Sequence, residues 1–316
     1  MSALTAPARV RRELVHRANE QEILVSPPWR AGDGGYGGTT VTTALSPYYR
    51  DHPGTHWLDA LLLIEACRQA ALSAAHEFED LSPDIAFFFN SIEMEITDAE
   101  QLALLKDELT ILSEFGELRL RGDGSPKQIT YDQRGTDSSG RTVVRTSMAV
   151  QGLPKGRYPE LRAYQRGGSA APTTAGLRSG AGPRPALGSP ESVGRTEAAN
   201  VAIAGVRSEG GTLVADLAPD FANASLFDHD YDHYPAMVLI EAGRQLALSG
   251  TPDPAGHLVT AVRATFDNFA ELDAPIRLVA RHGERWVDVN CVQDDLVVTR
   301  MSLALAPAPA GEGRAR

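Results

Sequence analysis

Two short polar sets stand out because they interrupt apolar stretches at helical spacing. Each has a glutamate, an arginine three residues later and a glutamine directly after it: Glu65, Arg68 and Gln69 in the first, and Glu241, Arg244 and Gln245 in the second. Side chains at this spacing project from one face of a helix. Because the neighbouring positions are apolar, these polar groups must be at least partly buried, where an unpaired charge is costly. We expect them to line a pocket; the alternative is an ion pair on a solvated stripe.

A histidine precedes each glutamate by about a dozen residues and follows an aspartate directly, as Asp51-His52 and Asp228-His229. A loop at this distance can bring an imidazole near the first turn of the helix, where free N–H groups stabilise negative charge developing on an acyl oxygen. Imidazole and carboxylate together form a general acid/base pair. The alternative is that the histidines cap local turns and the aspartates are surface acids.

Metal binding is a weaker interpretation of the same loop. Residues 228–233 are rich in ligand types, and His229 and His233, four residues apart, could hold zinc if the loop were helical. The corresponding part of the first set contains Pro53-Gly54, which breaks a helix. We therefore expect no metal and no cofactor. Gly32 to Gly38 lacks the lysine and following helix of a phosphate-binding loop, and we expect an ordinary loop there.

The elements that carry these residues occur twice. Leu61–Ser73 aligns with Met237–Ser249 with nine of the thirteen positions identical, which indicates a tandem duplication. We expect one long buried helix in each copy, over residues 59–77 with Asp59 as its N-cap, and over residues 235–249 with Gly250 ending it. Strand-like runs surround both helices: 22–25, 86–96, 111–120, 127–131 and 142–150, then 202–206, 212–217, 259–269, 275–280, 285–291 and 296–304.

This order predicts an α+β chain of two similar domains, each a long helix wrapped by an antiparallel sheet. We place the first domain at residues 1–155 and the second at residues 196–306. Residues 156–195 between them are rich in Gly, Pro, Ser and Ala and are expected to be a flexible linker, while residues 307–316 are expected to be a disordered tail.

Composition excludes several classes of function. The 316 residues carry a net charge of −11, which argues against a nucleic-acid binder. Two cysteines, far apart in the chain, fit a reducing cytoplasm and give no disulfide framework. The most apolar stretch, 60–75, is interrupted by charges and is shorter than the roughly 20 residues that span a bilayer. No secretion signal is visible, so we expect a cytoplasmic protein that does not enter a membrane.

The histidine loop leading into a helix marked Leu-Ile-Glu-Ala resembles the hotdog fold of acyl-carrier-protein dehydratases. The fuller pattern is similar to the A-factor biosynthesis (AfsA-type) hotdog family: Glu-Ala-x-Arg-Gln in both copies, the run from Asp228 to Glu241 and an opening Val15-His16-Arg17. The likeness covers roughly residues 13–153 and 196–306. It implies a tandem, or double, hotdog fold.

The resemblance also implies an activity, which is the transfer of a β-ketoacyl group from an acyl carrier protein to the hydroxyl of dihydroxyacetone phosphate. This reaction belongs to γ-butyrolactone signal biosynthesis. The catalytic residues would be His229, Glu241, His52 and Glu65. The residues that would bind substrate, including the phosphate at either arginine and the thioester oxygen at Pro235 and Ala236, are Arg68, Gln69, Arg244, Gln245, Asp228, His233, Pro235 and Ala236.

Three matters stay open in the sequence. The reaction could instead be dehydration or hydrolysis of a biosynthetic acyl thioester, or the chain could be a non-catalytic double hotdog that binds an acyl or lactone ligand. One of the two equivalent sites could be degenerate, and the second copy is nearer the family pattern. The partners we expect are an acyl carrier protein or acyl thioester and a phosphorylated small alcohol, in a monomeric pseudo-dimer or a homodimer.

Overall fold

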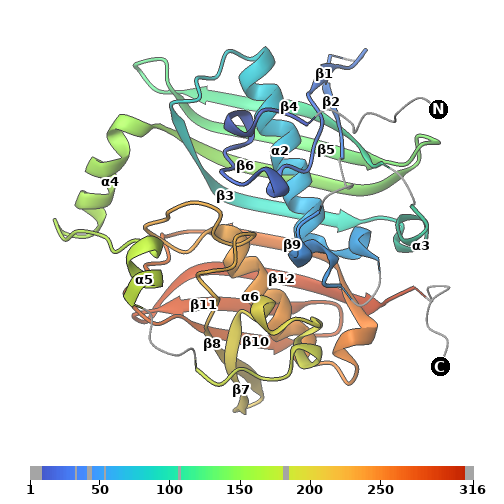
Figure 1. The fold of residues 1–316 in the computed structure, drawn as a ribbon, viewed down its shortest axis with the longest axis vertical. Helices are drawn as coiled ribbons and strands as arrows, with labels where there is room; N and C mark the ends of the chain where they lie inside the picture. Colours follow the sequence, from blue (N-terminus) through green and yellow to red (C-terminus); the bar gives the residue numbers. More distant parts are fainter. Residues whose placement is uncertain are drawn as a thin grey trace.

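One antiparallel sheet of twelve strands runs through the whole molecule and supports both copies of the repeat (Figure 1). The computed structural model describes residues 9–32, 34–40, 45–52, 55–105, 108–180 and 185–309. The strands of the first half are β1 (Trp29–Arg30), β2 (Tyr36–Thr39), β3 (Ile85–Ile96), β4 (Thr110–Leu120), β5 (Pro126–Thr136) and β6 (Thr142–Pro154). Those of the second half are β7 (Ile203–Glu209), β8 (Thr212–Leu217), β9 (His257–Phe266), β10 (Arg277–His282), β11 (Val287–Gln293) and β12 (Leu296–Pro307).

The strand order shows the duplication directly. It is β1-β2-β4-β5-β6-β3 in the first half, followed by β9-β12-β11-β10-β8-β7 in the second, so the second half repeats the first in mirror order. The halves join where β3 pairs with β9, from Ser91 opposite Thr265 to Glu95 opposite Ala261. The expected α+β tandem hotdog is confirmed, with the two sheets fused into one.

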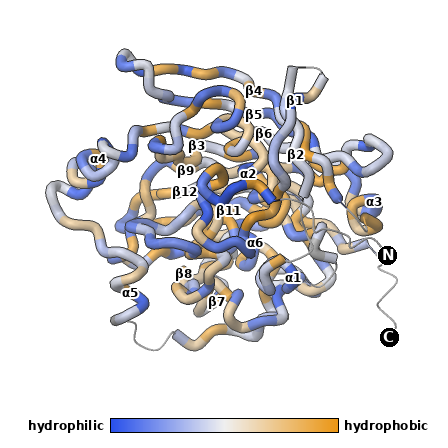
Figure 2. Tube along the Cα trace, turned by 45° about the horizontal axis from the view of Figure 1, so that its top comes forward, coloured by the Kyte–Doolittle hydropathy of each residue, from blue (hydrophilic) through white to orange (hydrophobic). Residues whose placement is uncertain are grey.

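Each half wraps its sheet around one long helix, α2 (Ala60–Phe78) or α6 (Ala236–Ser249). Asp59 caps α2 as expected, since its carboxylate accepts hydrogen bonds from the backbone N–H groups of Leu61 and Leu62. Both helices are buried over nearly their whole circumference, and Figure 2 shows hydrophobic stretches gathered around them. This burial explains why a polar set on either helix must find partners within the protein.

Short helices complete the chain. They are α1 (Pro47–Arg50), α3 (Ala99–Ala103), α4 (Tyr158–Gln165) and α5 (Thr174–Gly180), with 3-10 turns at Arg12–Val15, Glu20–Glu22, His56–Leu58, Lys155–Arg157, Pro190–Val193, Ala198–Asn200 and Pro254–Gly256. Among the described residues, no helix combines the length and apolarity needed to cross a bilayer.

Two local predictions near the N-terminus were wrong. Residues 22–25 are not a strand: Glu20–Glu22 form a 3-10 turn, and Val25 makes a single bridge to Thr40. The glycine-rich stretch expected as a loop contains β2. Its glycines let the strand pass close to its neighbours, because a Cβ on Gly37 would lie 2.2 Å from the Trp29 ring.

Residues 156–195, expected as a flexible linker, contain α4, α5 and the Pro190–Val193 turn. Arg162 on α4 has a side chain only 5% exposed, and it binds Asp232 at 2.9 Å and Glu271 at 2.7 Å. These ion pairs fix α4 against the second half, an arrangement that composition alone does not reveal. At the other end, the expected tail starts inside β12, and Ala308 donates to the Gly256 carbonyl at 2.8 Å. Residues 310–316 lie outside the described residues.

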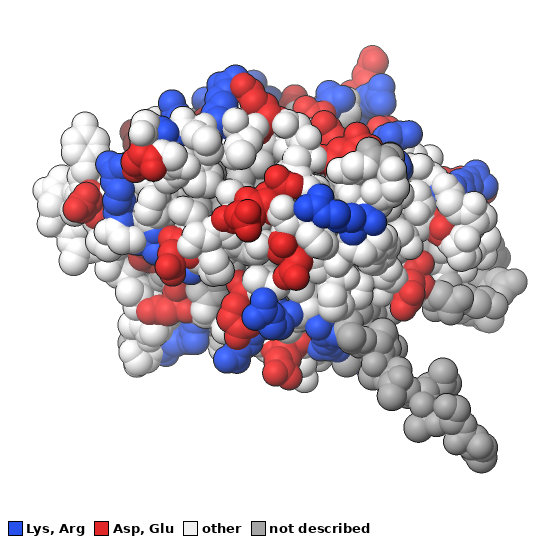
Figure 3. Space-filling model, turned by 90° about the horizontal axis from the view of Figure 1, so that it is seen from above, with Lys and Arg blue, Asp and Glu red and all other residues white. Residues whose placement is uncertain are grey.

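Charged side chains of both signs are mixed on the surface. On the face shown in Figure 3, acidic and basic side chains lie in small neighbouring groups.

We predict that Arg162→Ala lowers the free energy of unfolding by about 2 kcal/mol, because Asp232 and Glu271 would lose a shared, largely buried partner. Urea denaturation measures this change. Arg119→Ala is the control, since its side chain is 58% exposed and that of its partner Glu117 is 56% exposed, and it should cost less than about 1 kcal/mol. Equal small losses in both variants would show that α4 is not fixed by these ion pairs.

Candidate active site

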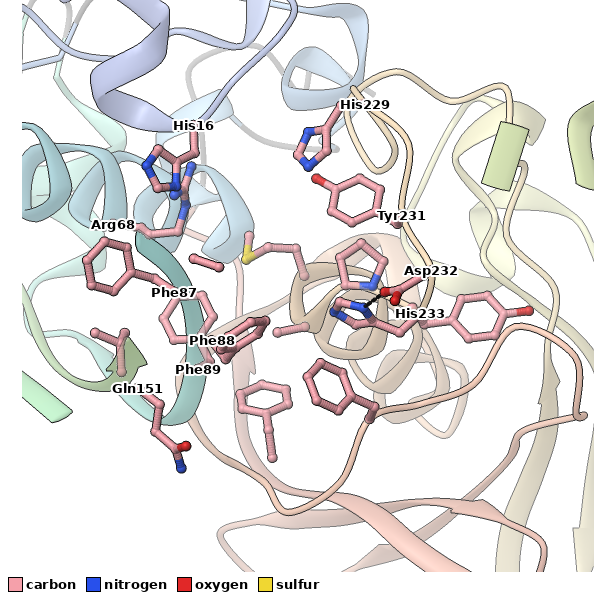
Figure 4. Close-up of a pocket in the computed structure, with 18 of the residues that line it drawn as sticks. His16, Arg68, Phe87, Phe88, Phe89, Gln151, His229, Tyr231, Asp232 and His233 are labelled. Carbon is pink, nitrogen blue, oxygen red and sulfur yellow. Dashed lines mark hydrogen bonds and ion pairs between the residues drawn. The ribbon is translucent and has the colours of Figure 1, made fainter. Parts of the chain in front are cut away.

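A cleft of about 1080 Å³ lies between the two halves. The first half contributes Glu65 and Arg68 from α2 and a wall of β3, while the second contributes residues 229–234 and the start of α6. Figure 4 shows His16 and Arg68 from one half facing His229 and Tyr231 from the other across the cleft. The histidine of the second copy therefore meets the polar set of the first.

Glu65 holds the polar set in place. It is fully buried, and its carboxylate accepts from Arg17 Nε at 2.9 Å, from Arg68 Nε at 2.8 Å and Nη2 at 2.7 Å, and from Gln69 Nε2 at 2.6 Å. Burial opposes ionisation, but the two guanidiniums outweigh it and lower the pKa of Glu65 to about 2. The carboxylate is a fixed anion with both oxygens engaged, so the expected role as a proton carrier does not fit this geometry.

Arg68 reaches the cleft from this network. Its Nε and Nη2 bind Glu65, and Nη2 also donates to the Val15 carbonyl at 2.9 Å. Its Nη1 forms no hydrogen bond with a described residue, and the side chain is 19% exposed. A guanidinium held on one edge and free on the other can receive an anion from the cleft.

His229 and Asp228 form a dyad on the opposite wall. Nδ1 of His229 lies 2.6 Å from Asp228 Oδ1, while the imidazole is 43% exposed and the carboxylate is completely covered. Asp228 also accepts from the backbone N–H of Ala18 at 2.8 Å and pairs with Arg17 at 3.3 Å. Burial opposes ionisation of Asp228, but the bond to His229 and the charge of Arg17 outweigh it and hold the pKa of Asp228 well below its usual range. With Nδ1–H committed to this carboxylate, Nε2 of His229 is left as the acid/base atom.

The start of α6 lies beside this dyad. Pro235 is the N-cap and lines the cleft together with Ala236 and Met237. The N–H groups of Val238 and Leu239 bond to the Pro235 carbonyl, so those of Ala236 and Met237 precede the first intrahelical bond. Such groups, with the positive end of the helix dipole, are suited to bind an oxyanion.

His233, the second histidine of this loop, has a different setting. Its Nδ1 lies 2.7 Å from Asp232 Oδ1 (Figure 4). The same oxygen accepts from the Tyr158 hydroxyl at 2.6 Å. Its ring packs edge-on against Phe269, with centroids 4.6 Å apart. His233 lines the cleft but is fastened to α4 and the aromatic wall, so it shapes the cleft beyond the dyad.

The remaining wall is largely aromatic and apolar. It descends from His16 and Arg68 along β3 toward β9 and α4. The side chains that form it are Phe87, Phe88, Phe89, Tyr158, Leu161, Phe266 and Phe269. The cleft thus has a polar end and an apolar length, which suits a substrate with one charged or polar part and one hydrocarbon chain.

The second copy of the polar set lies outside this cleft. Glu241 is fully buried and binds Arg195 at 2.9 Å and Arg244 at 2.8 Å, with the Arg195 guanidinium completely covered. His52 lies near these residues, and burial together with the cations Arg244 and Arg195 lowers its pKa to about 4. His52, Glu241 and Arg244 line none of the large cleft. Their predicted catalytic and substrate-binding roles find no support in this cleft. We call the second copy of the polar set the closed site, because Glu241, Arg195 and Arg244 are covered by protein.

Gln69 and Gln245 have a structural role that the sequence did not reveal. The amide oxygen of Gln69 accepts from the Leu24 N–H at 2.8 Å, and its nitrogen donates to the Glu22 carbonyl at 2.6 Å. Gln245 makes the same pair with Ala202 and Asn200 at 2.8 and 2.7 Å. Neither lines the cleft, so the predicted contact with substrate does not fit; each glutamine fastens a backbone segment to its helix.

Sequence reasoning missed the residues that link these groups. Arg17 joins Glu65 to Asp228, and Arg195 takes the same place in the closed site. The signal is present in the repeat, since Val15-x-Arg17 matches Val193-x-Arg195. Among the described residues, no group of three or more His, Cys, Asp or Glu side chains is arranged to hold a metal ion.

Comparisons with known proteins show which family this sequence matches. A family model described as "AfsA: A-factor biosynthesis hotdog domain" matches residues 2–150 and 179–313. A 2-oxo-3-(phosphooxy)propyl 3-oxoalkanoate synthase of Streptomyces virginiae is 27% identical over 299 residues, covering 92% of this chain and 95% of that protein. A synthase of the same name from Streptomyces griseus is 28% identical over 271 residues, covering 83% of this chain and 82% of that protein.

Among solved structures, the dehydratase domain from the CurK module of curacin polyketide synthase aligns with a TM-score of 0.47 and 12% identity. The alignment covers 91% of this chain and 98% of that chain.

We predict that Glu65→Gln makes the free energy of unfolding less dependent on pH in the acid range. The pKa of Glu65 is about 2 in the folded protein against an ordinary 4.5, so its stabilisation is present above pH 4.5 and is lost as the pH falls toward 2. Between pH 6 and pH 3 the variant should lose about 2 kcal/mol less unfolding free energy than the wild type. Urea titrations at each pH measure this. Glu93→Gln is the control, because the Glu93 side chain is 66% exposed. If the unfolding free energy of Glu65→Gln falls with pH as steeply as that of Glu93→Gln, Glu65 is not the buried anion described here.

Proposed function

Because the chain belongs to the A-factor biosynthesis hotdog family, we propose that it transfers a β-ketoacyl group from an acyl carrier protein to the hydroxyl of dihydroxyacetone phosphate. The names of the relatives describe the ester this reaction would form. The observation that carries the proposal is the Asp228–His229 dyad beside the start of α6, facing Arg68 of the other half. One cleft then offers a base, an oxyanion site and an anion site.

The acyl thioester would enter with its carbonyl oxygen at the N–H groups of Ala236 and Met237. Nε2 of His229 takes the proton from the acceptor hydroxyl, and the oxygen attacks the carbonyl carbon. The tetrahedral intermediate collapses by breaking the carbon–sulfur bond, and His229 returns the proton to the departing thiolate. Asp228 keeps Nδ1–H in place and stabilises the imidazolium between these two steps.

Arg68 would bind the acceptor's phosphate through its free edge, while the aromatic wall takes the acyl chain. This division matches the two ends of the cleft. Because one chain supplies both walls, we propose that the working unit is a monomeric pseudo-dimer with one open site.

The hydrogen bonds to both carboxylate oxygens of Glu65 favour acyl transfer over dehydration. A dehydratase that works through a helix carboxylate needs that group to exchange a proton, whereas both oxygens of Glu65 are held by guanidiniums. Hydrolysis would use the same dyad with water as the acceptor. A purified protein that releases carrier thiol but forms no phosphorylated ester would be a thioesterase, and one that does neither would be a binding protein.

We predict that His229→Asn lowers the rate of ester formation between about 100-fold and 10,000-fold, the range for losing a general acid/base. Mass spectrometry of the phosphorylated ester, with a β-ketoacyl carrier protein and dihydroxyacetone phosphate, measures the rate. His52→Asn changes the equivalent histidine of the closed site and should leave the rate within about two-fold of the wild type. Similar losses in both variants, or none in His229→Asn, would refute the assignment.

We predict that Arg68→Lys raises the KM for dihydroxyacetone phosphate about ten-fold, because an ammonium cannot bind Glu65 and a phosphate as a planar fork does. The KM for the acyl donor should not change. Arg244→Lys is the matched control in the closed site and should leave both constants unchanged. A rise in the acyl-donor KM alone would place the acyl group, not the phosphate, at Arg68.

A further inference from the structure

His16 occupies a left-handed backbone conformation, which is uncommon for residues other than glycine. It follows the Arg12–Val15 turn with φ 51° and ψ 48°, in the left-handed region where a side chain is strained. The equivalent residue of the second half is Gly194, with φ 72° and ψ 33° after the Pro190–Val193 turn. The second half therefore forms this turn with glycine, the residue that the left-handed conformation favours. The first half has a histidine at the same position. Strain kept in one copy points to a role in the site beside it.

The two halves differ in the space around this position. In the second half, a Cβ on Gly194 would lie 2.8 Å from Leu248 Cδ1, so that side has no room for a side chain. In the first half, the imidazole of His16 lines the cleft and stacks on Phe87 with centroids 5.9 Å apart. Arg68 is its immediate neighbour, since Nη2 of Arg68 donates to the carbonyl of the preceding Val15.

Hydrogen bonds fix which nitrogen of His16 is available. Nδ1 of His76 lies 2.6 Å from the Leu81 carbonyl, an acceptor, so His76 donates there and its Nε2 carries a lone pair. Nε2 of His16 lies 3.2 Å from that Nε2 and must be the donor. Nδ1 of His16 is therefore the free atom, and it can gain a proton without disturbing the bond to His76.

Two permanent cations lie near the ring. Burial lowers the pKa of His16 to about 3, and the charges of Arg68 on α2 and Lys155 after β6 lower it further. Glu13, Asp84 and Glu65 also line this region, but Glu65 is committed to its two arginines. Lys155 is exposed and forms no side-chain ion pair with a described residue. Two permanent cations and a neutral imidazole thus share one end of the cleft.

We infer that His16, Arg68 and Lys155 together bind the phosphate of the acceptor, and that Nδ1 of His16 takes a proton from solvent as the phosphate arrives. A phosphate dianion neutralises the two cations that oppose protonation and places negative charge beside Nδ1. The new Nδ1–H then donates to a phosphate oxygen, while Nε2–H stays bonded to His76. This inference rests on the proposed function for the identity of the acceptor.

Isothermal titration calorimetry measures directly the protons taken up when the ligand binds. Dihydroxyacetone phosphate is titrated into the full chain at pH 7.5 without an acyl donor, in two buffers of different ionisation enthalpy. The phosphate ester is mostly dianionic at this pH, because its second pKa is about 6. The wild type should take up a substantial fraction of a proton for each ligand bound. His16→Asn, whose side chain tolerates the left-handed region, should show no uptake and at least ten-fold weaker binding.

A second pair of variants separates binding from folding. His16→Gly removes the strain and should melt at or above the wild-type temperature while binding as weakly as His16→Asn. Asp295→Gly relieves the same kind of strain, at φ 62° in an exposed turn outside the cleft, and should bind like the wild type. If His16→Gly melts lower and binds normally, His16 is a structural residue and the inference is overturned.

The outcomes also distinguish this inference from the proposed function. Binding with proton uptake but no ester product would support the phosphate site and reject the acyl transfer. Ester formation with unchanged phosphate affinity in His16→Asn would reject the phosphate site and support the transfer. Absence of binding by the wild type would overturn the inference.

Discussion

The whole site depends on a chain of buried charges that runs from one half of the molecule to the other. Arg68 pairs with Glu65, Glu65 with Arg17, and Arg17 with Asp228 on the opposite loop. Each member is costly to bury alone, so removing one leaves the others uncompensated. This mutual dependence sets the position of His229 against Arg68. The same interactions that join the halves therefore set the geometry of the cleft.

Duplication produced two such chains of charges, and only the first opens onto the large cleft. In the second, Arg195 is completely covered and donates to Glu241, Asp59 and the carbonyl of Asp51. Gly194 stands where the first half has His16, and Leu248 fills the space beside it. The ion pairs of the closed copy also join the halves, since Arg195 binds Asp59 of the first half. The open copy adds groups that can meet a substrate.

The sequence predicted the features that depend on internal repeats and on the periodic spacing of apolar residues. The two helices, their caps and the tandem arrangement follow from apolar spacing and from the match between Leu61–Ser73 and Met237–Ser249. Local pattern could not show which copy of each polar residue faces the cleft, because that depends on how the halves pack. Gln69 and Glu65 illustrate this limit, because their types suggest chemistry. Gln69 instead binds backbone groups, and Glu65 binds Arg17, which is distant in the chain. Residues 156–195 were misjudged because Arg162 gains its carboxylate partners only in the folded chain.

A crystal structure with a non-reactive β-ketoacyl thioester analogue and dihydroxyacetone phosphate would test the location of the site most directly. The account places the analogue's carbonyl oxygen at the start of α6, its chain along Phe87 and Phe269, and the phosphate beside Arg68. Ligand density against His52 and Glu241, with the large cleft empty, would contradict it.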